Sequence, residues 1–324
     1  MDCGERHRAT VSRSAGPAFL IMTRFVLILQ LLPLTSYSYT MREPVFPIPV
    51  DNSMETLPEA SSLRQIYPED MFPNGSYAQL PHGRVRYWLL GPEDGTRVVL
   101  IHGISTPSIV WKAIAPYLAA HGLRVLVYDL YGKGYSQAPK VKYDATLFIT
   151  QLALLLQYIG WDNAHIVGFS MGGAIAAGFA AMLPQLVAGK IVFMSSAGLM
   201  ERVVPKSATR SLIPQYQEIR ELQEQWLTGY RTSLQSCFED GPVRGMSYAF
   251  NKLAGLHVGP EKKPLQALVI HGTADATVPY SEGLKISEKI PGAQLITIEG
   301  GEHNINMKDG DWQKVSETIV KFIH

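Results

Sequence analysis

The sequence has little of several features that define other classes of protein. It has two cysteines, Cys3 and Cys237, which are too few for a disulfide framework. Its 29 basic and 28 acidic residues nearly balance and the basic ones are scattered, so charge gives no reason to expect a nucleic-acid partner. No spacing of cysteine, histidine or carboxylate resembles a structural zinc or calcium site. We therefore expect no metal, and the chemistry described below needs no organic cofactor.

The chain also lacks internal repeats and has no low-complexity tract beyond a proline-bearing stretch near its start. Its 324 residues suit one large α/β domain preceded by a segment that does not resemble core. We divide the chain into a targeting segment at 1–40, a linker at 41–70 and a domain at 71–324. Within that domain we expect an insertion at about 199–263.

The targeting segment contains a largely apolar run at 18–34, interrupted by Arg24. Read from Met22, it has a short basic start, an apolar stretch at 25–34 and small residues at 35–38, which is the form of a secretory signal. An uncleaved anchor remains open and would associate the protein with a membrane through residues 18–34, although the arginine makes a spanning helix marginal. An organelle-directed or disordered extension is the third interpretation. The pattern favours the secretory pathway over the cytoplasm.

From residue 77 onward, strand-like and helix-like runs alternate. A hairpin is predicted at 77–80 and 85–90, around a Pro-His-Gly turn. Short apolar runs predict buried strands at 98–101, 125–128, 166–167, 191–194, 268–270 and 295–298. Helical patterns lie at 108–120, 145–159, 280–289 and 311–323. This alternation predicts an α/β fold with a mostly parallel sheet, helices on both faces and reactive residues beyond the carboxyl ends of the strands.

The alternation pauses between residues 197 and 264. Residues 215–226 form a charged amphipathic helical pattern within that interval. Because the insertion falls between two predicted strands on the reactive edge, we interpret it as a small helical lid. The alternative is a helical excursion over the surface.

Gly168-Phe169-Ser170-Met171-Gly172 is the most informative stretch of the chain. It has the form G-x-S-x-G, directly after an apolar strand-like run and directly before a run of small residues compatible with a helix. In that context the serine becomes an exposed nucleophile, and a side chain at Gly168 or Gly172 would clash with the neighbouring strand or helix. The alternative is an ordinary turn with a capping serine.

A serine hydroxyl needs a base, and that base needs an acid to orient it. His303 is the candidate base, in a glycine-rich loop after the last predicted strand. Asp275 is the candidate acid, just after the strand at 268–270, although it could instead cap the helix near Pro279. The chain order Ser170, Asp275, His303 is the order used by a serine on a strand–turn–helix motif of this kind.

An acyl-transfer intermediate also needs backbone donors for its oxyanion. The first candidate is the N–H of Met171, which follows the nucleophile. The second is the N–H of Ile104, which follows the pair His102-Gly103 after the strand at 98–101. His102 is expected to make a hydrogen bond that holds this turn.

Asp129 opens the glycine-bearing run 129–136, which lacks the spacing of a phosphate-binding loop. We therefore interpret this run as a structural turn in which the side chain of Asp129 accepts hydrogen bonds from nearby backbone.

Together these residues resemble the α/β-hydrolase family, in register from about Gly83 to the C-terminus. His102-Gly103 is similar to the family's oxyanion turn, and the run 129–136 to its D-x-x-G-x-G-x-S loop. The segment 168–173 resembles the nucleophile elbow, and the segment 272–279 the loop of the catalytic acid. The family commonly has glycine directly before the histidine, whereas here Glu302 intervenes between Gly301 and His303.

The serine at position 170 implies the serine branch of the family, because epoxide hydrolases and haloalkane dehalogenases carry aspartate there. The form Ser-Met-Gly-Gly is similar to that of esterases, lactonases, carbon–carbon bond hydrolases and cofactor-free haloperoxidases. These share one site and differ mainly in lid and pocket.

The resulting hypothesis is a serine hydrolase that cleaves a small apolar ester, thioester or lactone through an acyl-enzyme. Ser170 would attack the carbonyl, His303 would carry the proton, and Asp275 would orient His303. The amides of Ile104 and Met171 would hold the oxyanion. An acyltransferase or a carbon–carbon bond hydrolase at the same site is the alternative, and a hydrolase-fold protein that only binds a ligand is a further one.

Overall fold

A computed structural model describes residues 48–201 and 214–324. The expected targeting segment at 1–40 and its apolar run at 18–34 lie outside the described residues. Within the described ranges, no helix is both long and apolar enough to cross a membrane.

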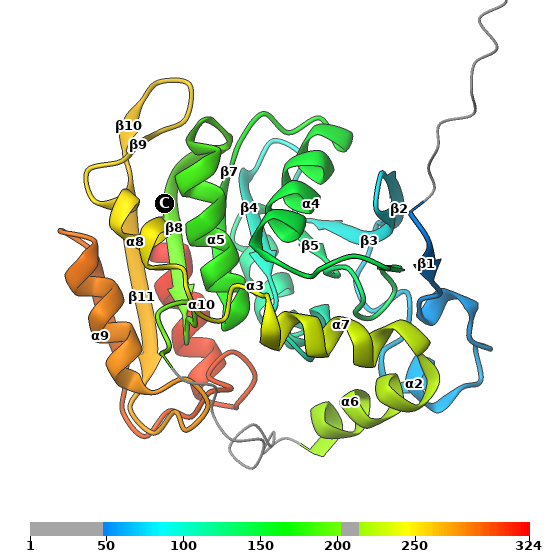
Figure 1. The fold of residues 1–324 in the computed structure, drawn as a ribbon. Helices are drawn as coiled ribbons and strands as arrows, with labels where there is room; N and C mark the ends of the chain where they lie inside the picture. Colours follow the sequence, from blue (N-terminus) through cyan, green and yellow to red (C-terminus); the bar gives the residue numbers. More distant parts are fainter. Residues whose placement is uncertain (1–47, 202–213) are drawn as a thin grey trace, which may run out of the picture. The chain divides into compact units, whose positions relative to one another are not determined.

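The centre of the domain is an eight-stranded sheet with strand order β12-β11-β8-β7-β4-β5-β3-β2 (Figure 1). Its strands are β2 (Gly75–Leu80), β3 (Gly83–Leu90), β4 (Thr96–Ile101), β5 (Leu123–Tyr128), β7 (Ala164–Phe169), β8 (Val187–Met194), β11 (Gln266–Gly272) and β12 (Gln294–Ile298). β2 and β3 pair antiparallel as a hairpin and β3 pairs antiparallel with β5, whereas the other pairings are parallel. The predicted α/β fold with a mostly parallel sheet is confirmed.

Helices cover both faces of this sheet, because each buried strand exposes apolar side chains alternately to the two sides. Val99 and Ile101 of β4 join one core cluster, and Val98 and Leu100 join the other. The first cluster includes α4 (Ala145–Tyr158), α5 (Met171–Met182), α8 (Ser247–Leu253) and α9 (Tyr280–Lys289), and the second includes α3 (Ile114–Ala120) and α10 (Asp311–Ile323). Figure 1 shows α4, α5 and α8 on the near face and α10 on the far one.

One helix differs from the prediction for residues 108–120. The structure has a 3-10 turn, η2 (Ser108–Trp111), followed by α3 from Ile114. Pro116 explains the break, because it has no N–H and its ring would clash with the carbonyl four residues earlier, on Lys112.

Residues 48–74 pack onto the domain, although the sequence predicted a linker over 41–70. They contain β1 (Val50–Asp51), η1 (Met54–Thr56) and α2 (Ser62–Ile66), and β1 pairs with β6 (Ala138–Pro139). The side chains of Met54, Leu63 and Tyr67 are fully buried. These apolar residues are too widely spaced to form a periodic pattern, so their burial depends on the domain surface they meet.

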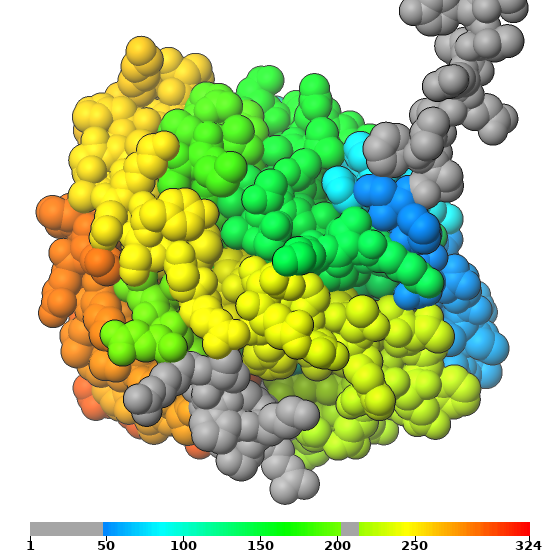
Figure 2. Space-filling view, in the orientation of Figure 1, coloured from blue at the N-terminus to red at the C-terminus, as the bar shows by residue number. Residues whose placement is uncertain are grey.

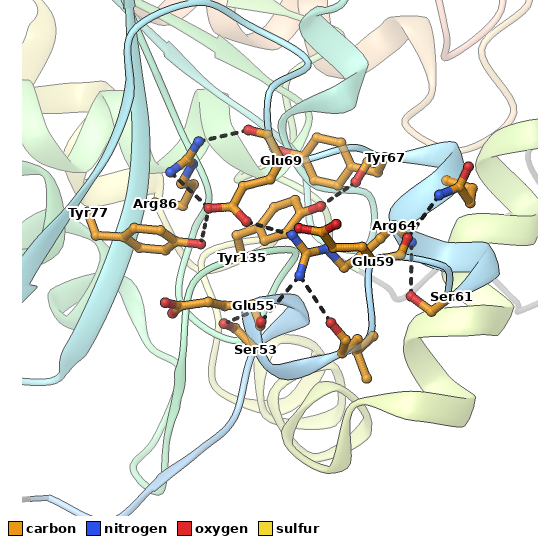
Figure 3. Close-up of polar contacts among 12 residues, drawn as sticks. Ser53, Glu55, Glu59, Ser61, Arg64, Tyr67, Glu69, Tyr77, Arg86 and Tyr135 are labelled. Atoms are coloured by element: carbon orange, nitrogen blue, oxygen red, sulfur yellow. Dashed lines mark hydrogen bonds and ion pairs between the residues drawn. The ribbon is translucent and has the colours of Figure 1, made fainter.

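A polar cluster around Glu69 fixes this segment to the sheet (Figure 3). The carboxylate of Glu69 lies 2.8 Å from Arg64 and 3.2 Å from Arg86, and it accepts a hydrogen bond from the hydroxyl of Tyr77. Arg86 is almost buried and its guanidinium lies over the rings of Tyr77 and Trp88. The cluster therefore joins the segment before the sheet to β2 and β3.

The interval between β8 and β11 contains α6 (Pro214–Trp226), α7 (Thr228–Glu239), α8 and a short hairpin of β9 (His257–Val258) and β10 (Lys263–Pro264). We call α6 and α7 the insertion helices. Figure 2 shows this part of the chain, coloured lime to yellow, as a band across one face of the molecule. The short 3-10 turn η3 (Pro184–Leu186) lies between α5 and β8.

Candidate active site

Ser170 lies in the turn between β7 and α5. Its backbone has φ 55° and ψ −121°, a strained conformation for a residue with a side chain. The N–H of Ser170 donates to the carbonyl of Met194 on β8, and its carbonyl accepts from the N–H groups of Gly173 and Ala197. These backbone hydrogen bonds hold the strained turn in place.

The two glycines of the motif have no room for a side chain. A Cβ at Gly168 would lie 2.3 Å from the carbonyl oxygen of Gly172, and a Cβ at Gly172 would lie 2.2 Å from that of Ile101. Because these contacts are with backbone, they cannot be relieved by rotating a side chain. Glycine at both positions allows α5 to begin directly against β7 and β4.

The structure brings Ser170, His303 and Asp275 into one hydrogen-bonded chain. The hydroxyl of Ser170 lies 3.1 Å from Nε2 of His303, and Nδ1 of His303 lies 2.8 Å from Oδ2 of Asp275. The serine is 7% exposed and the imidazole side chain 13%. A serine in this position can lose its proton to the imidazole, whose charged form the carboxylate would stabilise.

The loop after β11 holds the carboxylate of Asp275 with several donors. Oδ1 accepts from the N–H groups of Thr277 and Val278, both at 2.8 Å. Burial alone would raise the pKa of Asp275, but the neighbouring His303 and the hydrogen bonds from His271, His303 and Val278 hold it well below its usual range. Asp275 is therefore ionised where it accepts the hydrogen bond from His303.

The loops that carry Asp275 and His303 are joined to each other. The N–H of Ala274 donates to the carbonyl of Gly301 over 2.9 Å, and a Cβ at Gly272 would lie 2.1 Å from the same oxygen. This contact places His303 opposite Asp275 even though Glu302 separates it from Gly301. The ring of Phe169 packs against the imidazole at a centroid separation of 5.0 Å.

The turn after β4 passes directly beside the serine. A Cβ at Gly103 would lie 3.3 Å from the Cβ of Ser170. In the described ranges, the N–H groups of Ile104 and Met171 donate to no protein acceptor. Two backbone donors thus remain available on the turns next to Ser170.

His102 and Asp129 lie behind this turn, and both are fully buried. Nδ1 of His102 lies 2.8 Å from the carbonyl of Gly103, and Nε2 accepts from the N–H of Leu130. Burial lowers the pKa of His102 to about 3, so the ring is neutral. The carboxylate of Asp129 accepts from the N–H groups of Ser108 and Tyr135.

Sequence reasoning gave no role to several residues that support this site. His271 is buried, and its Nε2 lies 2.9 Å from the carbonyl of Val278 and 3.4 Å from Oδ2 of Asp275. Its place at the end of β11, four residues before the acid, is a signal that could have identified it. Tyr67, which donates to Asp129 from the segment before the sheet, had no such signal.

Comparison with known families gives the same fold. A family model described as the alpha/beta hydrolase fold matches residues 96–253, and one described as TAP-like protein matches residues 249–323. The chain belongs to the α/β-hydrolase family.

Three proteins similar to this chain illustrate the level of likeness. The chain is 27% identical to the dihydrolipoyllysine-residue acetyltransferase component of the acetoin cleaving system of Pseudomonas putida, over 74% of this chain and 67% of that protein. It is also 27% identical to a 2-hydroxy-6-oxo-2,4-heptadienoate hydrolase of Pseudomonas putida, over 62% of this chain and 80% of that one. The fold resembles that of a carboxylesterase from Bacillus subtilis, with a TM-score of 0.66, 17% identity, and coverage of 81% of this chain and 96% of the other. At such identity, the structural likeness shows the fold alone.

Proposed function

We propose that the protein is a serine hydrolase that cleaves a carboxylic ester, thioester or lactone through an acyl-enzyme. The observation that carries the proposal is the hydrogen-bonded chain from Ser170 through His303 to Asp275 at the carboxyl edge of the sheet. The strained backbone at Ser170 supports it, because such strain persists at functional turns.

In the proposed first step, Oγ of Ser170 attacks the substrate carbonyl while Nε2 of His303 takes the hydroxyl proton. The imidazolium faces Asp275 and then gives its proton to the leaving alcohol, thiol or ring oxygen. The carbonyl oxygen carries negative charge in the intermediate and accepts hydrogen bonds from the N–H groups of Ile104 and Met171.

In the second step, His303 takes a proton from water, and the resulting nucleophile attacks the acyl carbon. The acyl–oxygen bond to Ser170 breaks, the serine recovers its proton, and a carboxylic acid leaves. We also propose that the insertion between β8 and β11 is the lid of this site and that the acyl group is apolar.

The relatives favour a second candidate at the same serine. One is named as an acetyltransferase component and the other as a hydrolase of a 2-hydroxy-6-oxo-dienoate. Acyl transfer and carbon–carbon bond cleavage are the reactions of this second candidate. They would differ in the acceptor or in the leaving group, and the residues of the candidate triad would be unchanged.

A substrate panel tests the proposal. Purified full-length protein is given esters of increasing acyl length, a thioester and a lactone, with Ser170→Ala as the matched control. We expect turnover of at least one class and a loss of at least about 10⁴-fold in kcat in the variant. An acyl acceptor alcohol and a 1,5-diketone in the same panel identify the second candidate. Equal rates in both proteins would contradict the use of Ser170.

A further inference from the structure

The carbonyl oxygen of Ser105 is held by side chains from both insertion helices. The hydroxyl of Tyr230 on α7 donates to it over 2.8 Å, and Nε2 of Gln223 on α6 donates to it over 3.3 Å. Two donors from separate helices therefore meet at one peptide oxygen on the turn after β4.

Gln223 also bonds to the loop at 129–136, which follows β5. Its Oε1 accepts a hydrogen bond from the N–H of Gly134 over 2.9 Å, and the side chain has no exposed surface. With both ends of its amide used, Gln223 has one defined orientation. It joins the run 129–136 to Ser105 through a single side chain.

Ser105 lies in the same turn as the proposed oxyanion donor. Ser105 directly follows Ile104, whose N–H is an oxyanion donor in the proposed mechanism. His102 fixes the start of the turn through the carbonyl of Gly103, and Thr106 at its end accepts from Nε of Arg220 on α6. The turn is therefore held at one end by His102, which also bonds to Leu130 after β5, and at the other end by the insertion helices.

We propose that Gln223 and Tyr230 are positioning residues that hold the oxyanion turn through the carbonyl of Ser105, so that the packing of α6 and α7 sets the geometry of the Ile104 donor. This inference rests on the proposed serine-hydrolase function. Oxyanion donors act over a narrow range of about 2.7–3.1 Å, so a small rotation of the turn weakens them. Loosening the insertion helices then slows acyl transfer without altering Ser170, His303 or Asp275.

The alternative is that both side chains only stabilise the fold. Kinetic measurements distinguish the two roles, because an oxyanion donor stabilises mainly the transition state. A positioning role lowers kcat and weakens binding of a trifluoromethyl ketone, whose adduct with serine carries an oxyanion. A purely structural role leaves both unchanged in protein that remains folded.

The experiment uses Tyr230→Phe, which removes one oxygen, and Gln223→Met, which removes both polar ends at similar length. The first control is Tyr143→Phe, since the hydroxyl of Tyr143 is buried and has no partner in the described ranges. The second control is Leu222→Met, a change of similar volume beside Gln223 that preserves the packing of α6 and leaves both hydrogen bonds of the Gln223 amide in place. All proteins are full length, and thermal unfolding confirms that each is folded at the assay temperature.

We expect both test variants to lose roughly 10- to 100-fold in kcat and similarly in affinity for the trifluoromethyl ketone, with KM within about threefold of wild type. Both controls should keep wild-type values. Because the two donors share one oxygen, the double variant should lose less than the product of the single losses.

Unchanged kcat and inhibitor affinity in folded Tyr230→Phe would overturn the inference, and this variant alone decides the question if Gln223→Met does not fold. In that case wild type still turns over ester, and the proposed function stands. If wild type neither turns over the panel nor binds the ketone, the proposed function fails and this inference fails with it.

Discussion

His102 accepts a hydrogen bond at Nε2 from the backbone N–H of Leu130, over 2.9 Å. Because Nδ1 of the same ring lies 2.8 Å from the carbonyl of Gly103, one buried imidazole joins the loop after β5 to the turn after β4. Accepting at one nitrogen while donating from the other requires the neutral ring. The turn beside Ser170 thus depends on a histidine that stays uncharged.

This dependence predicts a loss of stability in mild acid. The folded-state pKa of His102 is about 3, below the value of about 6.5 for an unfolded chain, so the unfolded state takes up the proton first. Stability should fall as pH decreases through that window, by about 2 kcal/mol from this residue between pH 7 and pH 5. Urea unfolding of wild type and His102→Gln at both pH values measures the contribution of His102 to this change in stability.

The variant replaces the titrating ring with an amide that can still accept from Leu130. Its free energy of unfolding should change less between pH 7 and pH 5 than that of wild type, by about the same 2 kcal/mol. Identical changes in the two proteins would show that the ring is not held neutral by the fold.

Gly172→Ala should damage the fold more than an ordinary glycine substitution. Its Cβ would lie 2.2 Å from the carbonyl oxygen of Ile101, so β4 or α5 must move, at a cost of about 3 kcal/mol or more. Gly300→Ala is the matched control, because Gly300 has φ 65° but open space around it and should lose only about 1 kcal/mol. Equal losses in denaturant unfolding would contradict the steric account.

Ser170→Gly should be more stable than Ser170→Ala, although both lack the side-chain hydroxyl. The backbone at position 170 has φ 55°, which glycine adopts without the steric cost that alanine keeps. We expect a difference of about 1 kcal/mol in the free energy of unfolding. A glycine variant no more stable than the alanine variant would show that the turn is unstrained.

Glu69→Gln should weaken the attachment of residues 48–74. It leaves Arg86 buried without its charge partner and removes the 2.8 Å pair with Arg64, for an expected loss of about 1–2 kcal/mol. Glu261→Gln is the control, since Glu261 pairs with Lys263 at the exposed surface and its removal should leave the unfolding midpoint unchanged. Limited proteolysis before β2 should accelerate only in the Glu69 variant.

The central strands of the sheet were predictable because they are continuous apolar runs, which can be recognised without tertiary information. Runs such as 98–101 and 268–270 are buried on both faces, and each falls within a strand of the structure. The break at Lys112 was missed because apolar periodicity continues across it, while the proline that causes it stands four residues later.

The segment 48–74 was beyond sequence reasoning for a different reason. Met54, Leu63 and Tyr67 become buried only against residues that lie far along the chain, and Tyr67 bonds to Asp129 across 62 positions. Local composition there is that of a linker. Gln223 was missed because it is polar, although its spacing from Tyr216 and Ile219 places it on the buried face of α6.

The candidate site could be predicted from the sequence because the carboxyl ends of parallel strands share one edge of a sheet. That rule alone places the loops of Ser170 and Asp275 near each other, and the G-x-S-x-G motif selects the serine. The distances within the site depend on tertiary contacts such as that of Ala274 with Gly301, which no local pattern shows.

The most direct test of the central claim is covalent labelling of full-length protein by a fluorophosphonate, followed by mass spectrometry of the labelled peptide. The account predicts one phosphonate on Ser170 in wild type, none in Ser170→Ala, and labelling at least about 100-fold slower in His303→Gln because the serine loses its base. Folded wild-type protein that stays unlabelled, or a label that persists in Ser170→Ala, would contradict it.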